Sequence, residues 1–428
     1  MATAPIRTAS RDYFTDKSVL LDPYDYFESI RADGPVHRMP SRDIVIVTGF
    51  QDGVEVLLNT HDYSSIINPE PLRPLPFEPH SDDISEQIEA AQGTGPMELM
   101  VSYDGERHAA ARSLLNPLFK PSRLKTNAAF MRDYADDMVR RIVANGSCEL
   151  IAEVATPYVT MVIADLLGVP DDDREAFRQV IDAGPPPGNM EETDEEARAR
   201  ASGPLMFMIG YFNRYLAERR ANPQNDVMTE LALATFPDGS TPDLIEPVKA
   251  AMFLFAAGQD TSAKLIGNAL RFLCENPEMQ QHLRENRDQI GPFLEETLRL
   301  EGSTKATFRV AKRKTTIGGV EIRAGQVVVV ALPAANRDPL RWDQPTEFRL
   351  NRPRIKEHLA FGRGAHTCAG APLARAEVQV LLDRLLEHTT AITLSEAHHG
   401  EAGNRKIAYE PSFIIRGLAE LHVEFVPR

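Results

Sequence analysis

The chain has 428 residues, of which 43% are hydrophobic and 25% charged, and its formal net charge is −15. This composition suits a large globular core and excludes collagen-like and low-complexity chains. The acidic excess argues against nucleic acid and anionic membrane surfaces as main partners. Three widely spaced cysteines indicate a reducing compartment rather than a disulfide framework.

Residues 1–20 are polar and aperiodic, which predicts an extended arm without the apolar stretch of a signal peptide. The longest apolar runs, around 250–257 and 327–335, are too short to span a bilayer. We therefore expect a cytoplasmic protein that does not bind membranes. No linker divides the sequence, so we predict one mainly α-helical domain with small β sheets over residues 1–428.

Short elements are predicted first: a helix from Asp22-Pro23 to Gly34, a strand at Ile44–Val47 and a helix to about Asn59. Residues 66–103 differ, because six prolines break any long element there. A loop-rich segment with one short helix near Ser85–Ala91 is expected. Long loops in compact proteins are usually functional or disordered.

Glu106–Leu115 predicts a helix that Pro117 ends. His108 and Arg112 lie four residues apart and so share one face of it. That spacing alone is more typical of a solvated surface. Further helices are expected at about 124–145, 151–168, 171–182 and up to Arg220, with a turn or hinge at Gly184–Gly188 and a solvated charged face at Glu191–Arg200.

The longest helical pattern spans 243–275 and contains the polar stretch Ala257–Thr261. Three interpretations of this stretch compete. Gly258 could relieve packing at a cost of roughly 1 kcal/mol, or Asp260 could face solvent. Alternatively, a carboxylate and a hydroxyl at a helix distortion could hold water and relay protons. Phe253, Ala257 and Thr261 share one face, which would line a pocket.

Glu296 and Arg299 lie one turn apart, a spacing that is weak evidence alone. Strands are expected at Phe308–Ala311, Thr315–Ile317 and Val327–Leu332, with Gly318-Gly319 as a hairpin turn. Arg309 lies on the first of them and could simply be exposed. Near the C-terminus, residues 412–415 and 421–425 are expected to pair as a hairpin, from which Phe413 could reach the pocket.

The loop Phe361–Gly370 carries the most specific pattern in the chain. Gly362 and Gly364 allow a left-handed turn close to a flat ligand. An apolar-periodic helix follows to about His388, so Cys368 precedes a helix N-terminus, where the helix dipole and free amides favour a thiolate. Such a thiolate is a good axial ligand for haem iron.

Two other interpretations of Cys368 must be weighed. A lone cysteine is usually a small buried hydrophobic residue. His366 and Cys368 could also form half of a zinc site, although no second ligand pair has suitable spacing. The chemistry of the loop alone therefore leaves the three alternatives open.

The ten residues 361–370 resemble the haem-binding signature of the cytochrome P450 family, Phe-Gly-x-Gly-x-His-x-Cys-x-Gly, without departure. The stretch ending at Thr261 is similar to the acid–alcohol pair of that family, and Glu296-x-x-Arg299 to its Glu-x-x-Arg motif. The resemblance implies the cytochrome P450 fold, a helical prism around haem. It also implies a substrate-pocket loop at 66–103 and lid helices at 171–220.

Residue roles follow from the same resemblance. Cys368 would be the axial ligand of haem b, in the haem-thiolate loop and helix at 361–388. Further cofactor-binding residues would be His108, Arg112, Arg309 and His366, which hold the propionates, Phe361, which shields the thiolate, and Gly370. Asp260 and Thr261 would deliver protons. Arg352, with Arg349 as alternative, would join Glu296 and Arg299 in a structural ion pair.

The implied reaction inserts one oxygen atom of O2 into an apolar small molecule, in a pocket to which we assign Phe253, Ala257 and Phe413. Electrons would come from a ferredoxin and its ferredoxin reductase, which we expect to dock near Arg112 and Arg363. Two alternatives remain. One is a peroxide-driven oxygenase, although such relatives usually lack the Asp–Thr pair; the other is a non-catalytic haem-binding sensor.

Overall fold

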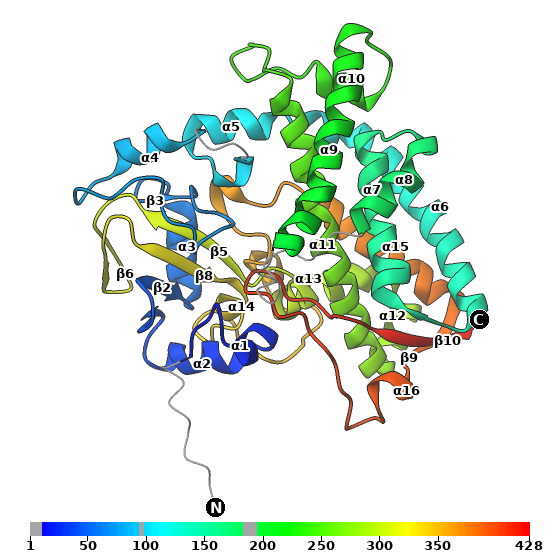
Figure 1. Ribbon diagram of the computed structural model, residues 1–428. Coiled ribbons are helices and arrows are strands. Elements are labelled where there is room, and N and C mark those ends of the chain that lie inside the picture. The colour runs from blue at the N-terminus through cyan, green and yellow to red at the C-terminus, as the bar shows by residue number, and fades with distance from the viewer. Residues whose placement is uncertain (1–10, 94–97, 183–194) are drawn as a thin grey trace, which may run out of the picture.

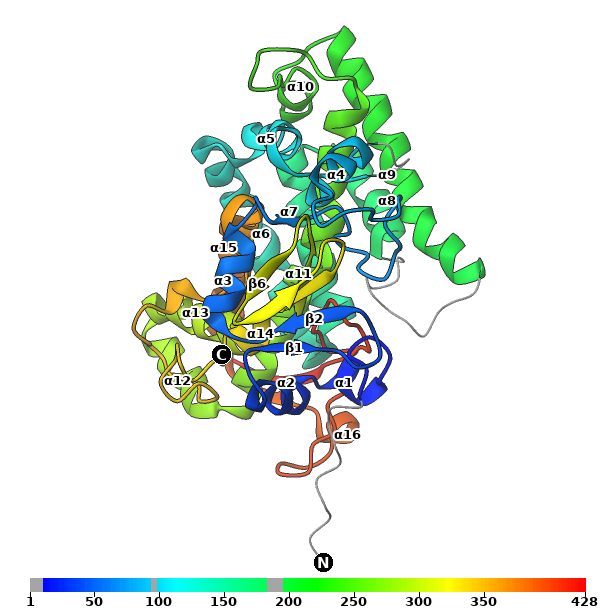
Figure 2. The ribbon, with the colours of Figure 1, turned by 90° about the vertical axis from the view of Figure 1, so that its left-hand side faces the viewer.

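The computed structural model describes residues 11–93, 98–182 and 195–428. Most of the long helices lie on one side of the molecule and the main sheet lies on the other, as Figure 1 shows, and Figure 2 views the molecule from the side of the sheet. Across the described residues, no helix has both the length and the apolar character needed to cross a membrane. The architecture is mainly α with small sheets, as the sequence predicts.

The N-terminal segment is not an extended arm, so that prediction is wrong for residues 11–20. It forms a turn and then α1 (Lys17–Leu21), whose first turn is capped by Asp16. Tyr13 and Phe14 are buried and pack in an aromatic cluster around α2 (Tyr24–Ala32). Burial of these two rings ties the segment down. Residues 1–10 lie outside the described residues.

The main sheet has five strands in the order β1 (Val36–Arg38), β2 (Ile44–Val47), β8 (Val327–Ala331), β5 (Ala306–Ala311) and β3 (Tyr63–Ser64). β2 and β8 pair in parallel, and the other neighbours are antiparallel. All of β2 is buried, because Ile44 and Ile46 enter one apolar cluster while Val45 and Val47 enter another. The sheet is therefore covered on both faces.

The helical side is built around α11 (Ile245–Glu275), which packs against α7, α9, α13 and α15. Its predicted extent of 243–275 agrees closely. The helices of this side are α6 (Pro121–Asn145), α7 (Thr156–Leu167), α8 (Asp171–Asp182), α9 (Glu195–Ala221), α10 (Val227–Ala232), α12 (Pro277–Glu285), α13 (Ile290–Glu301) and α15 (Ala371–His388). The predicted helix at 151–168 begins with a π-helical turn, Ile151–Ala155.

Shorter elements complete the described chain: α3 (Phe50–Leu58), α4 (Ser85–Ala91), α5 (Gly105–Ser113), α14 (Leu332–Ala335), α16 (Glu396–His399) and the hairpin of β6 (Thr315–Ile317) with β7 (Val320–Ile322). The hairpin turns at Gly318-Gly319, as predicted, with positive φ at both. The predicted hinge at Gly184–Gly188 and the side chains of Glu191–Arg200 lie outside what the structure describes.

The predicted C-terminal hairpin is wrong. β10 (His422–Pro427) pairs with β9 (Thr389–Leu394) and β4 (Ser147–Glu149) instead. Residues 412–415 already have other backbone partners, since Lys305 donates to the Ile414 carbonyl at 2.7 Å and Thr304 bridges Ile415. The local apolar pattern could not reveal these distant partners.

Candidate active site

The cysteine loop is a tight turn placed against the end of α3. Gly362 and Gly364 have φ of 65° and 78°, and the Cys368 amide donates to the Phe361 carbonyl at 2.9 Å. A Cβ on Gly364 would lie 2.6 Å from the backbone oxygen of Leu57, whereas one on Gly362 would meet nothing closer than 3.7 Å. Gly364 thus allows a close approach that any side chain would block.

Cys368 follows this turn and precedes α15. Its thiol is exposed, although burial by the surrounding protein raises its pKa above the usual value. The amides of Gly370 and Ala371 and the charge of Arg112 act in the opposite direction. The predicted effect of the helix N-terminus therefore has the expected sign, but desolvation outweighs it.

Four donors from three parts of the chain converge beside this loop. His108 and Arg112 come from α5, Arg309 from β5 and His366 from the cysteine loop. The rings of His108 and His366 are 4.0 Å apart between centroids. Burial, followed by the charges of Arg309, His108 and Arg112, lowers the pKa of His366 to about 3. Burial also lowers the pKa of Arg309 to about 10.

This cluster is held from behind by residues that the sequence did not single out. The Ser65 hydroxyl lies 3.1 Å from Nε2 of His366. Asp104 accepts hydrogen bonds from the Ser65 amide at 3.0 Å and from Gln92 at 2.9 Å. The negative charge of Asp104 also raises the pKa of Arg309 and so partly offsets the effect of burial on it. Its position before a helix suggests only a cap, and its partners are distant in sequence.

The middle of α11 presents an accessible face although the helix is packed on several sides. Ala257 is exposed and Phe253 and Thr261 are half-buried, at the predicted spacing. The predicted helix distortion is absent, because α11 runs unbroken. The Thr261 hydroxyl donates to the carbonyls of Ala257 and Gly258, at 2.9 and 3.3 Å. Gly258 does relieve packing, since a Cβ there would lie 3.0 Å from Ile163.

Asp260 lies next to Thr261 on the same helix, and its side chain is 18% exposed. Burial raises the pKa of its carboxyl to about 6, although the charge of Lys264 opposes the shift. Oδ1 lies 3.9 Å from Nζ of Lys264, while Oδ2 has no hydrogen-bond partner among the described residues. Glu377 on α15, which is fully buried, is a nearby acid that sequence reasoning missed. Burial raises its pKa to about 8, against a hydrogen bond with Ser262.

Glu296, Arg299 and Arg352 meet in a buried ion network. Arg299 bonds both carboxylate oxygens of Glu296, at 2.8 and 2.9 Å, and Arg352 donates to the same group at 2.9 Å. The Arg349 side chain pairs with Asp343 instead, and only its backbone amide reaches Glu296. The structure thus brings together Glu296, Arg299 and Arg352, and the alternative partner Arg349 does not join them through its side chain.

Phe361 and Phe413 occupy different surroundings. The Arg375 guanidinium stacks over the Phe361 ring at 4.6 Å and is held by Glu295, a contact the sequence did not reveal. Phe413 is 7% exposed and packs against Phe14 and Phe308 in the apolar cluster of the sheet. Its packing accounts for its burial, and a place for it in the pocket stays a prediction.

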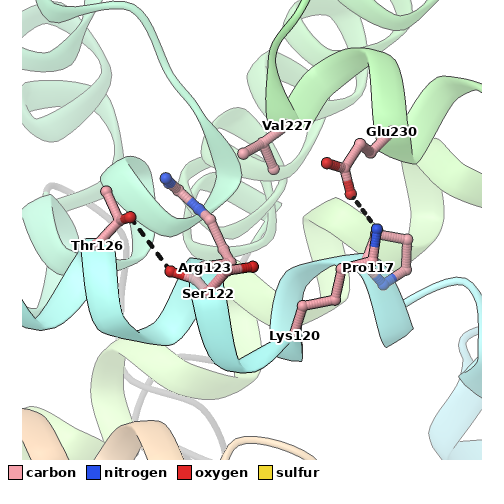
Figure 3. A pocket seen from close by; sticks show the side chains of 7 residues that line it. All are labelled: Pro117, Lys120, Ser122, Arg123, Thr126, Val227 and Glu230. Carbon is pink, nitrogen blue, oxygen red and sulfur yellow. Dashed lines mark hydrogen bonds and ion pairs between the residues drawn. The ribbon is translucent and has the colours of Figure 1, made fainter.

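Two surface hollows lie elsewhere. One, of about 180 Å³, lies between the start of α6 and α10. Figure 3 shows its lining side chains, among which Lys120 pairs with Glu230. The other, of about 500 Å³, lies beside α2, α3 and residues 338–341. Neither is lined by a residue predicted for the site.

Comparison with known proteins decides the family. The family model for cytochrome P450 matches residues 78–398. Cytochrome P450 144 of Mycobacterium tuberculosis is 30% identical over 98% of this chain and 93% of its own length. The chain belongs to the cytochrome P450 family.

Solved cytochrome P450 structures agree over nearly the full length. Substrate-free CYP150A6 of Mycobacterium marinum superposes with a TM-score of 0.91 at 45% identity, covering 98% of this chain and 99% of that one. CYP109E1 of Bacillus megaterium in complex with corticosterone gives 0.80 at 25% identity, covering 95% and 99%. The protein therefore has the cytochrome P450 fold and is an oxidoreductase, a monooxygenase of a haem-thiolate family.

The residues present fit a haem group. Cys368 is exposed and its thiol could bind the iron, and Ala257 is a small exposed residue on the accessible face of α11. Burial, together with the charges of Arg112 and Arg309, lowers the pKa of both His108 and His366, as expected where cationic groups gather without the carboxylates that haem propionates would supply. The thiol therefore suits the iron of haem, and the neighbouring hydrogen-bond donors suit its propionates.

Proposed function

We propose that this cytochrome P450 binds haem b through Cys368 and hydroxylates an apolar small molecule with O2. The observation that carries the proposal is the exposed Cys368 beside the cluster of His108, Arg112, Arg309 and His366, of which His108 and Arg309 are buried. We assign the propionates to this cluster, since charge-assisted hydrogen bonds to carboxylates are strong. When bound, the haem iron would supply the binding and reduction of O2.

The chain's own residues would handle protons and exclude water. Thr261 offers a hydroxyl on the accessible face of α11, and Asp260 stands next to it with a pKa near neutrality. A group whose pKa lies near the working pH both takes up and releases protons readily. We assign proton delivery to this pair. Phe361 would cover the thiolate and keep water from it, with Gly370 in the same loop.

The substrate class and electron source are proposed on separate grounds. Phe253 and Ala257 give α11 an apolar accessible surface, and a relative, CYP109E1, was solved with corticosterone. We propose a mid-sized apolar substrate enclosed by the loop at 66–103 and the lid at 171–220. Electrons would come from a ferredoxin and ferredoxin reductase that dock near Arg112 and Arg363. We further propose one domain over residues 1–428.

Replacing Thr261 tests the proton-delivery assignment. Thr261→Ala removes the hydroxyl while the helix backbone bonds remain, so electrons should be lost to hydrogen peroxide. Product formed per nicotinamide cofactor oxidised should fall by about tenfold or more. The measurement is peroxide and product yield with a surrogate ferredoxin and reductase.

Thr261→Ser is the matched control, because it keeps the hydroxyl and should stay coupled. Tight coupling in Thr261→Ala would contradict the role of Thr261. Equal turnover with peroxide alone, without the reductase chain, would favour a peroxide-driven oxygenase. No turnover with either supply would favour a sensor.

A further inference from the structure

Lys264 is buried between two half-buried acids, Asp260 on α11 and Glu410 near the C-terminus. It lies one turn after Asp260 on α11, and its side chain is 5% exposed. Nζ is 3.9 Å from Oδ1 of Asp260 and forms a closer ion pair with Oε1 of Glu410. It also donates to the Leu418 carbonyl at 3.4 Å. Nζ of Lys264 therefore lies closer to the C-terminal segment than to Asp260.

A turn in the C-terminal segment leaves space for the side chain of Lys264. Residues 409–418, here called the 409–418 turn, reverse direction so that Tyr409 bridges Leu418 and the Glu410 amide donates to the Gly417 carbonyl at 3.0 Å. A Cβ on Gly417 would lie 2.1 Å from Cδ of Lys264. Only glycine leaves room for the lysine stem at this point. Asn268, one turn further along α11, donates to the Arg416 carbonyl at 3.3 Å.

Asp260 and Glu410 share Lys264 as a cationic partner, and the lysine contacts only one carboxylate oxygen of each. Oδ2 of Asp260 and Oε2 of Glu410 are both buried without a hydrogen-bond partner among the described residues. The charged groups that face Asp260 are Lys264 from its own helix and Glu410 from the 409–418 turn. Glu410 in turn faces Lys305, which Arg416 repels. A change at Glu410 must therefore reach Asp260 through the shared lysine as well as directly.

We infer that Lys264 is a positioning residue whose charge is shared between Asp260 and Glu410, so that the 409–418 turn sets how readily Asp260 exchanges a proton. This inference rests on the proposed function, in which Asp260 delivers protons, but it concerns residues far from the cysteine loop. Glu410 acts through Lys264 rather than on the substrate or the cofactor. The C-terminal segment thereby helps to control proton exchange at Asp260.

The inference predicts opposite effects for two charge-removing variants. Lys264→Met removes the cation that stabilises the Asp260 carboxylate, so the Asp260 pKa should rise by about one pH unit. Glu410→Gln removes a competing anion and frees the lysine to approach Asp260, so the Asp260 pKa should fall by a similar amount. A merely structural disturbance would not give opposite signs.

Infrared pH titration of the haem-loaded protein measures this directly. The Asp260 band is identified by its loss in Asp260→Asn. Lys120→Met, in the surface pair with Glu230 at 2.6 Å, is the matched control and should leave the band unchanged. Should Lys264→Met fail to fold, Glu410→Gln still decides, because a rise or no change in the Asp260 pKa there overturns the inference.

A double variant of Lys264 and Glu410 distinguishes an effect that passes through the shared lysine from direct repulsion between Glu410 and Asp260. In the Lys264→Met background, Glu410→Gln should lower the Asp260 pKa less than it does in the wild-type protein. An equal effect in both backgrounds would mean that Glu410 acts directly, which overturns the sharing. The pH dependence of peroxide release is recorded in parallel. Shifted carboxyl titrations with an unshifted release profile would support the sharing and contradict proton delivery by Asp260.

Discussion

Single residues of the cysteine loop serve different physical purposes. Gly362 and Gly364 both adopt left-handed backbone conformations, but only Gly364 lies against the backbone of Leu57. Gly362 thus shapes the turn, while Gly364 also sets how closely the loop approaches α3. Because the loop carries Cys368 and His366, that approach positions both the thiol and one member of the cluster of His108, Arg112, Arg309 and His366.

Replacing each glycine with alanine separates the two purposes. Gly362→Ala should cost about 1–2 kcal/mol of unfolding free energy, because a Cβ disfavours the left-handed conformation. Gly364→Ala carries the same strain plus a contact with a backbone atom that cannot rotate away. Its loss should exceed that of Gly362→Ala by on the order of 1–3 kcal/mol. Urea unfolding followed by circular dichroism measures both, and equal losses would contradict the close-approach argument.

For single residues, the sequence revealed which side chains carry the chemistry better than it revealed the residues that surround them in the fold. The pattern around Cys368 and the Asp260–Thr261 pair could be read locally, because their spacing lies within one loop or one helix turn. Lys264 and Glu410 could not be paired, since 146 positions separate them and nothing local links them. Asp104 was missed for the same reason.

Among the elements, the network of Glu296 connects α13 to the irregular segment before the cysteine loop. Arg299 also donates to the carbonyls of Asn336 and Glu347, at 2.8 and 3.1 Å, so one guanidinium fixes several loop backbones. The side chains of Glu296 and Arg299 are fully buried, and that of Arg352 is 3% exposed. The network therefore holds the loops that lead into Phe361–Gly370.

Breaking this network should destabilise the protein strongly. Glu296→Gln leaves two buried guanidinium groups without their carboxylate, which costs about 3–5 kcal/mol of unfolding free energy. The matched control is Glu321→Gln, in the exposed Lys314–Glu321 pair at 2.8 Å. Exposed pairs contribute little, so this variant should behave like wild type in urea unfolding. Similar losses in both variants would contradict the structural role of the network.

Element prediction succeeded where a pattern was long and failed where tertiary partners decided. The 31-residue α11 shows its helical period along its whole length. The C-terminal hairpin failed because Lys305 and Thr304 supply the backbone partners of residues 412–415. The short α1 was missed because burial of Tyr13 and Phe14, rather than periodicity, holds that segment in place.

For the whole molecule, the sheet and the helical side bring their donors to one place. β5 supplies Arg309, α5 supplies His108 and Arg112, and the cysteine loop supplies His366, whose pKa burial and the other three residues lower. No single element could build this arrangement. The ordered motifs were enough to indicate the family from sequence, whereas the substrate depends on loop side chains whose directions no periodicity reveals.

The central claim is that Cys368 ligates haem iron as a thiolate. The most direct test is the absorption spectrum of the purified, reduced protein under carbon monoxide. The account predicts the strongly red-shifted band typical of thiolate-ligated haem, its loss in Cys368→Ala, and its retention in Cys148→Ala, where the cysteine is buried beside β10. A wild-type spectrum without that band, or a Cys368→Ala spectrum that keeps it, would contradict the claim.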